Sequence, residues 1–192
     1  MKSKRALKII GGLSKPSKMP GWAYGLPAKE CKTGSKLVKV KNSVCHGCYA
    51  LKGCYVFKVV QQAQYRRLRS IKKASWIPAM VEAIRSKRSN YFRWHDSGDV
   101  QDKEHLFKIF AVCKLTPNVK HWMPTREAWV KTFLKLKPSN LVIRFSAPMV
   151  DMPAPDTWPN TSTVVTSGPT CPAPLQDNEC KDCRACWDPA IK

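Results

Sequence analysis

The sequence has few acidic residues and no long hydrophobic run. Only 13 of its 192 residues are Asp or Glu, against 34 Lys or Arg, which gives a formal net charge of +21. The basic N-terminal stretch contains an apolar run of only a few residues, too short for the core of a signal peptide or for a membrane span. We therefore expect a cytoplasmic protein that does not associate with a membrane.

Several motifs of common enzymes are also missing. The sequence shows no paired carboxylates, no glycine-rich loop that could cradle a phosphate and no nucleophile elbow. These absences argue against the hydrolases and nucleotide-binding enzymes that depend on such motifs.

The scarce acidic residues are unevenly placed. Residues 1–88 hold 21 Lys and Arg against Glu30 and Glu82 alone, a net of 21 − 2 = +19, whereas residues 89–192 have 13 basic and 11 acidic residues, a net of +2. A surface so one-sided attracts phosphate polyanions through the release of counterions. The basic half therefore predicts nucleic acid as a partner, with a merely solvated basic surface as the simpler alternative.

Cysteine, by contrast, is abundant, with nine residues in two groups and one outlier. The C-terminal group comprises Cys171, Cys180, Cys183 and Cys186. Thiols at every third residue favour an iron–sulfur cluster, in which each thiolate meets a different iron, over a zinc site built from two separate pairs. In a reducing compartment, clustered cysteines more often hold metal than form disulfides.

The N-terminal group comprises Cys31, Cys45, Cys48 and Cys54. Three ligands would leave one iron of a 4Fe-4S cluster open to a small molecule, whereas four would close it. Zinc is a stronger alternative for this group, because one C-x2-C pair with two flanking thiols also suits a tetrahedron. Cys113 lies in a helical pattern and is expected to be a buried structural thiol.

Hydrophobic periodicity predicts helices and strands in alternation. The expected helices are 56–71, 74–87, 102–115 and 127–136, and the expected strands are 91–96, 119–123, 141–146 and 162–167. Little periodicity is visible in residues 21–54, where we expect an irregular segment organised by metal. Trp76, Trp94 and Trp129 are expected to serve the core.

This alternation predicts an α/β fold, either a small partial barrel or an open parallel sheet of βα units, with Cys-rich, metal-organised N- and C-terminal segments. The chain would divide into a flexible basic arm (1–20), a cysteine loop with the βα domain (21–170) and a Cys-rich, cluster-binding tail (171–192).

Polar residues recur where three successive strands are expected to end. In a parallel sheet these residues would converge on one rim, where a glycine-containing turn and guanidinium groups could bind a carboxylate or phosphate. The candidate ligand-binding residues are Ser97, Gly98, Asp99, Arg126 and Arg144. His95 and Asp96 precede this turn and could form either an acid–base pair or a structural hydrogen bond.

Four stretches together resemble the phage gene-product-88-like family: CHGCYALKGCYVF, RWHDSGDVQDKEHLFKIF, the strand ending in Thr125-Arg126, and CKDCRACWDP. The resemblance covers roughly residues 20–190. It implies a phage protein, in the cytoplasm of a host cell, with metal bound by cysteine.

More distantly, the layout is similar to that of radical S-adenosylmethionine (SAM) enzymes. That likeness implies that Cys31, Cys45 and Cys48 hold a SAM-binding cluster and that the four C-terminal cysteines hold a second one. It also places Ser97-Gly98-Asp99 near the SAM amino group. The spacing departs from the C-x3-C-x2-C of those enzymes, because 13 residues separate Cys31 from Cys45.

The favoured hypothesis is a phage protein with one or two 4Fe-4S clusters. Its extension is a radical-SAM-like redox enzyme, in which SAM would be a further cofactor. The alternative is a non-enzymatic nucleic-acid-binding protein stapled by zinc or iron–sulfur clusters. A third hypothesis is a small protein that binds a host protein during infection.

Overall fold

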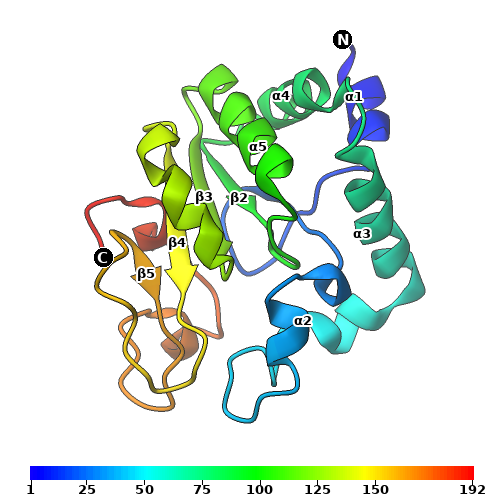
Figure 1. Cartoon of the computed structure of the whole chain (residues 1–192). Helices are drawn as coiled ribbons and strands as arrows, with labels where there is room; N and C mark the ends of the chain where they lie inside the picture. The colour runs from blue at the N-terminus through cyan, green and yellow to red at the C-terminus, as the bar shows by residue number, and fades with distance from the viewer.

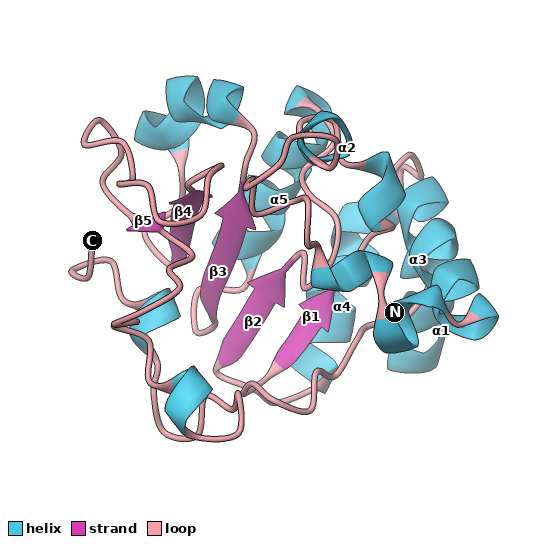
Figure 2. Ribbon diagram, turned by 90° about the horizontal axis from the view of Figure 1, so that it is seen from below, coloured by secondary structure: helices cyan, strands magenta, loops and turns pink.

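A computed structural model describes all residues from 1 to 192. The chain forms an open five-stranded sheet with helices packed against it (Figure 1). The strands are β1 (Trp22–Tyr24), β2 (Tyr91–Trp94), β3 (Lys120–Thr125), β4 (Leu141–Ser146) and β5 (Thr161–Ser162). They lie side by side in chain order, and every neighbouring pair is parallel (Figure 2). The predicted α/β class with an open parallel sheet is confirmed.

The α-helices are α1 (Ser3–Ile10), α2 (Gly34–Leu37), α3 (Lys58–Ser70), α4 (Trp76–Ser86) and α5 (Lys103–Leu115). α5 connects β2 to β3, and its first turn is capped by Asp102, whose carboxylate accepts a hydrogen bond from the His105 N–H at 2.8 Å. The 3₁₀ segment η4 (Ala128–Leu136) connects β3 to β4.

One face of the sheet packs on helices and forms the apolar core. Phe92 and Trp94 of β2 point to this face, where Trp94 lies against Trp76 of α4 with ring centroids 6.2 Å apart. Trp76, Trp94 and Cys113 are all fully buried there, as the sequence predicts. Trp129 is partly buried against the same cluster.

The opposite face is covered by the C-terminal tail. Trp187, in the 3₁₀ turn η6 (Ala185–Trp187), donates a hydrogen bond from its indole N–H to the Phe92 carbonyl at 3.0 Å. Its ring meets those of Tyr91 and Trp122 edge-on, at centroid distances of 5.4 Å and 5.2 Å. The two faces of one sheet are therefore covered by very different parts of the chain.

The prediction of a flexible arm over residues 1–20 is wrong for its first half. Residues 3–10 form α1, and Ala6 and Ile10, four residues apart on one side of it, are fully buried in the core. The glycines and prolines of this segment end the helix at Gly11 rather than prevent it.

Three element predictions also need correction. The segment 21–54 contains the edge strand β1, which has three residues and is too short for a periodic signal. The expected strand at 162–167 ends after Ser162, because Val164 and Val165 are exposed and find no partner strand. The expected helix at 127–136 is the 3₁₀ segment η4. The division of the chain at residues 20 and 170 stays a prediction.

Candidate functional site

A cavity of about 460 Å³ opens at the carboxyl ends of the strands. Its walls are residues that follow β2, β3 and β4, together with the segment 28–50. This is the edge at which parallel sheets bind their ligands. The predicted site residues that line it are Cys31, Cys45, Cys48, Ser97, Gly98, Asp99 and Arg126.

Cys31, Cys45 and Cys48, which we call the cavity trio, line the cavity together, and two of them lie beside Gly34. A Cβ atom placed on Gly34 would lie 3.5 Å from the Cys45 sulfur and 3.7 Å from the Cys31 sulfur, so both sulfurs border the space left by the missing side chain. Burial raises the pKa of Cys31 and of Cys45, and the neighbouring Cys48 raises both further. The three thiols therefore share one partly buried environment.

The segment that carries Cys31 is tied to the end of β3 by Glu127. The Glu127 carboxylate accepts hydrogen bonds from the Thr33 N–H at 2.8 Å, the Thr33 hydroxyl at 3.0 Å and the Trp129 indole N–H at 3.1 Å. Sequence analysis did not single out Glu127 or Gly34. Glu127 could still be predicted as a strand-end residue, because it directly follows Arg126 after β3.

Asp99 joins the turn after β2 to the end of β3. Its carboxylate accepts hydrogen bonds from the N–H groups of Val100 (2.7 Å) and Arg126 (2.8 Å) and from the Thr125 hydroxyl (2.8 Å). Burial raises the pKa of Asp99 to about 7 against the opposing effect of these hydrogen bonds. The carboxylate thus fixes the site's shape, and its bonding capacity is largely used within the protein.

The rest of this turn offers mainly backbone to the cavity. The Ser97 hydroxyl accepts a hydrogen bond from the Gln64 amide at 2.9 Å and donates one to the Leu26 carbonyl at 2.8 Å. Gly98 has φ +76°, and a Cβ there would lie 2.7 Å from the Leu26 Cβ, so only glycine fits.

Two guanidinium groups supply positive charge at the cavity. Arg126 donates a hydrogen bond to the Ala147 carbonyl at 2.6 Å, and its charge opposes the rise in the pKa of Cys45. Arg93 lies 4.5 Å from the centroid of the Trp122 ring and donates to the Tyr49 hydroxyl at 3.3 Å. Both favour negatively charged groups in the cavity.

The structure contains no hydrogen bond between His95 and Asp96, which was one of the two alternatives predicted for this pair. Both ring nitrogens of His95 and one carboxylate oxygen of Asp96 are buried without a hydrogen-bond partner. Burial holds the pKa of His95 well below its usual value, so the ring is neutral. The residue has φ +58°, an uncommon conformation for a non-glycine residue.

Arg144 does not reach the cavity. Its side chain lies on the tail-covered face of β4, where the guanidinium donates hydrogen bonds to the carbonyls of Thr161, Ala185, Cys186, Asp188 and Ile191 at 2.9–3.3 Å. The structure therefore places Arg144 among the contacts that hold the tail, apart from the other predicted ligand-binding residues.

The four C-terminal cysteines, which we call the tail quartet, lie near one another. Burial raises the pKa of Cys186 to about 11, with smaller contributions from Cys180 and Cys171. Burial also raises the pKa of Cys180, and Cys171 and Cys183 add to the rise. Arg93 acts in the opposite direction on both Cys180 and Cys186, so the quartet lies on the Arg93 face of the sheet.

Cys54 stands apart from both groups. It is exposed in the 3₁₀ turn η3 (Gly53–Val56) and does not line the cavity. The structure therefore does not bring this predicted ligand to the cavity trio.

No group of three or more His, Cys, Asp or Glu side chains is arranged so that it could hold a metal ion. A zinc ion with Zn–S bonds of about 2.3 Å would keep its sulfurs within about 4.6 Å of one another. A 4Fe-4S cluster places each thiolate on a different iron, so its ligands stand farther apart. The metal organisation predicted for both cysteine groups thus remains a prediction.

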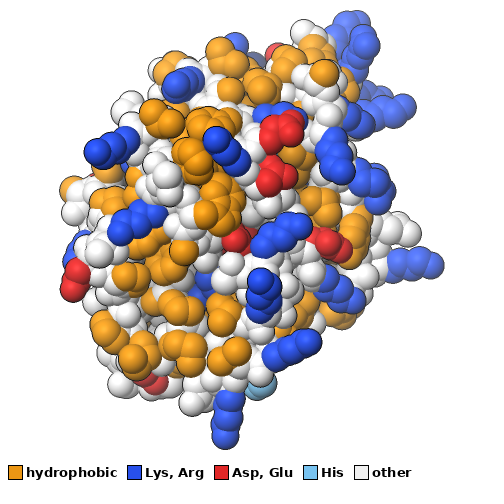
Figure 3. Space-filling view, in the orientation of Figure 1, with side chains coloured by type: hydrophobic (Ala, Val, Ile, Leu, Met, Phe, Trp, Pro, Cys, Tyr) orange, Lys and Arg blue, Asp and Glu red, His pale blue; other side chains and the backbone are white.

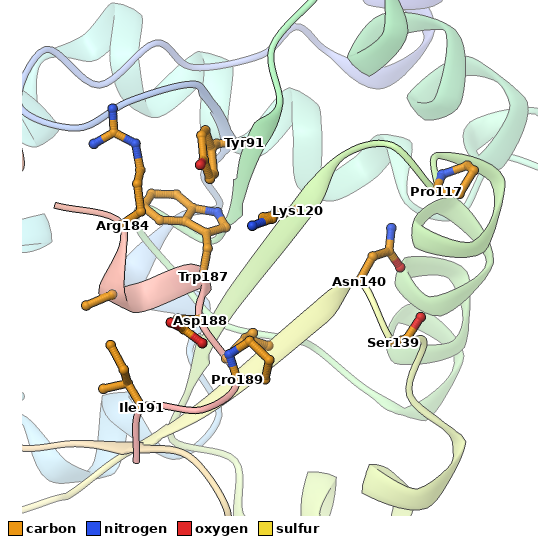
Figure 4. Close-up of a pocket in the computed structure, with 12 residues that line it drawn as sticks. Tyr91, Pro117, Lys120, Ser139, Asn140, Arg184, Trp187, Asp188, Pro189 and Ile191 are labelled. Carbon is orange, nitrogen blue, oxygen red and sulfur yellow. The ribbon is translucent and has the colours of Figure 1, made fainter. Parts of the chain in front are cut away.

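A second cavity, of about 550 Å³, lies at the opposite edge of the sheet. Figure 4 shows it between the tail and the starts of the strands, with Tyr91, Trp187 and Arg184 on one side and Lys120 and Asn140 on another. It contains no cysteine and none of the predicted site residues.

No helix has both the length and the apolar character needed to cross a membrane. Comparison with curated proteins and with solved structures gives no match. Comparison with protein families gives one description, Gene product 88, which matches residues 2–189. With nearly its whole length matched, the chain belongs to the phage gene product 88 family.

Proposed function

We propose that this phage protein binds a 4Fe-4S cluster through the cavity trio. The observation that carries the proposal is that Cys31, Cys45 and Cys48, remote from the β2 turn in sequence, line one cavity with that turn and Arg126. Three thiolates would occupy three irons and leave the fourth for a small ligand. Such a cluster supplies one-electron chemistry to a ligand bound beside it.

The trio borders a cavity of about 460 Å³ in which a cluster would stand, with zinc as the alternative metal. The nearby guanidinium groups of Arg93 and Arg126 would also offset the negative charge that several thiolates bring.

We further propose that the ligand at the open iron is SAM, which would make the protein a radical-SAM-like enzyme. The backbone of Ser97 and Gly98, which line the cavity, would meet the amino group of such a ligand. Arg126 has guanidinium N–H groups beyond the one bound to Ala147, and these suit a carboxylate. The tail quartet would hold the second cluster.

Anaerobic purification followed by iron and acid-labile sulfide analysis tests the cluster. We expect about four irons per chain for one cluster and about eight for two, with visible absorption. Zinc without sulfide, or a colourless protein without iron, would refute the proposal. Isothermal calorimetry with SAM then tests the ligand: no heat in an iron-loaded sample would reject SAM and leave the cluster standing.

A second candidate function is nucleic-acid binding, which the charge of the N-terminal half favours. Neither ion pair of the structure, Glu104–Lys108 or Asp156–Lys192, involves residues 1–88, so the net charge of this half is not neutralised internally. The two functions are compatible, because a cluster can be structural in a nucleic-acid-binding protein.

A further inference from the structure

A concave basic surface lies between α1 and α3. The cavity there has a volume of about 590 Å³, and its cationic residues are Lys8, Arg66, Arg69 and Lys73. No Asp or Glu lines it. Figure 3 shows Lys and Arg side chains gathered along the edge of the molecule that α1 and α3 form in Figure 1. We call this surface the α1–α3 groove.

Three of the four groove cations lie at the C-terminal end of α3. Arg66 and Arg69 are three residues apart on the helix, and Lys73 lies just beyond its last residue, Ser70. All three are exposed and form one stripe. Lys73 also donates a hydrogen bond to the Ile9 carbonyl at the end of α1, at 3.1 Å, so the stripe joins the two helices.

The composition of the groove indicates which polyanion it fits. It has no aromatic side chain on which an unpaired base could stack, so it lacks the usual means of gripping a single strand. Its apolar residues Leu7 and Ile9 are partly buried against the core and leave no apolar face to insert into a membrane. What remains is a row of cations suited to closely spaced phosphates.

We propose that the α1–α3 groove binds the phosphate backbone of a double-stranded nucleic acid without reading its sequence. The proposal rests on the second candidate function, nucleic-acid binding, and is independent of any metal. It assigns contacts to the four cations of the groove, and it predicts a strong dependence on salt because each neutralised phosphate releases counterions.

The test is the binding of a fluorescent 30-base-pair DNA to the full-length protein, measured by anisotropy between about 0.05 and 0.3 M salt. Four contacts predict that log K falls with log salt with a slope of about −3.6. The double variant Arg66→Gln/Arg69→Gln should reduce that slope by about 1.8 and weaken binding at 0.1 M salt by at least roughly tenfold.

The matched control is Lys131→Gln/Lys135→Gln, which removes the same charge from exposed positions of η4, on another part of the molecule (Figure 1). Its slope should equal that of the wild type. An equal loss of DNA affinity in both variants would mean that only net charge matters, and it would overturn the proposal that the groove is the binding site. Circular dichroism of each variant checks that the fold is retained.

Three other outcomes also decide the matter. No binding of duplex by the wild type overturns the groove and the nucleic-acid function together. Binding to phosphatidylserine vesicles without binding to duplex assigns the surface to a membrane and overturns the proposal. Duplex binding by a sample that contains no iron supports the groove whatever the anaerobic iron analysis finds, so failure of the cluster proposal and failure of the groove can be told apart.

Discussion

The two faces of the sheet are covered in different ways. Helices α4 and α5 cover one face with large apolar side chains such as Trp76 and Ile109, both fully buried. The other face is covered by a tail with only short 3₁₀ turns, through Trp187 and through backbone carbonyls that accept hydrogen bonds from Arg144. The first face is stabilised by burial of apolar area. The second depends on a few specific contacts, and this explains why a metal would add most there.

The largest predicted effect is a loss of folding stability at acid pH, and it arises on the helix-covered face. Burial lowers the pKa of His105 and of His121 to about 3, and it lowers that of His95 as well. The unfolded chain takes up these protons near pH 6.5, so stability is complete above that value and is lost as pH falls towards 3. At pH 5.5 each histidine should cost on the order of 1 kcal/mol, whereas Asp99, whose pKa is raised to about 7, gains its proton in the folded protein over the same range and offsets part of this loss.

Urea unfolding at pH 7.5 and 5.5 measures this loss. His121→Gln removes one titrating group while keeping an amide that can bond with the Thr116 hydroxyl, which lies 2.8 Å from the His121 ring. The variant should therefore lose less stability than the wild type between the two pH values. Equal stability of the wild type at both pH values would contradict the prediction.

The next effect concerns the tail-covered face. Trp187→Ala removes the side chain of a residue that is only 3% exposed, and it should lower the free energy of unfolding by about 3 kcal/mol. The matched control is Leu175→Ala in the same tail, where the side chain is 87% exposed and the loss should stay below about 0.5 kcal/mol. A similar small loss for both variants would show that the tail does not stabilise the sheet.

Arg144 provides a smaller, more local test. Arg144→Met keeps an unbranched apolar stem but leaves the tail carbonyls without their donor, which should cost about 2 kcal/mol. Limited proteolysis should then cut residues 171–192 faster while the helices stay protected. Arg144→Lys keeps the charge and part of the bonding, so its cleavage rate should lie between those of Arg144→Met and the wild type.

The smallest expected change in overall stability comes from single cysteines, and it separates the two groups. In an iron-loaded protein, Cys45→Ser should reduce bound iron without faster cleavage of the tail, because Glu127 still anchors the Cys31 segment. Cys183→Ser should reduce iron and also speed cleavage of the tail. Iron content and proteolysis measured on the same samples check this. Unchanged iron in both variants would refute cluster binding by these residues.

Much of the fold between residues 91 and 146 could be predicted from the sequence. β4 is buried along most of its length and reads as an apolar run, and α5 has a capping residue and a regular apolar side. β1 could not be found, because its role depends on Tyr24 and its contacts with α1, α3 and α4, which are remote in sequence.

Apart from the cysteines, the site was predictable where residues follow a strand. Asp99 and Arg126 come after β2 and β3, so the geometry of a parallel sheet brings them to the same edge as the cavity trio. Arg144 lies within β4, where a side chain stands perpendicular to the sheet, and it therefore meets the tail instead of the cavity.

The position of Trp187 has a consequence for how the protein is made. The residues that cover the Tyr91–Trp122 face follow all five strands in the chain, so a sheet that forms before they dock leaves two aromatic rings exposed to water. That bare surface would be open to chaperones and to other chains.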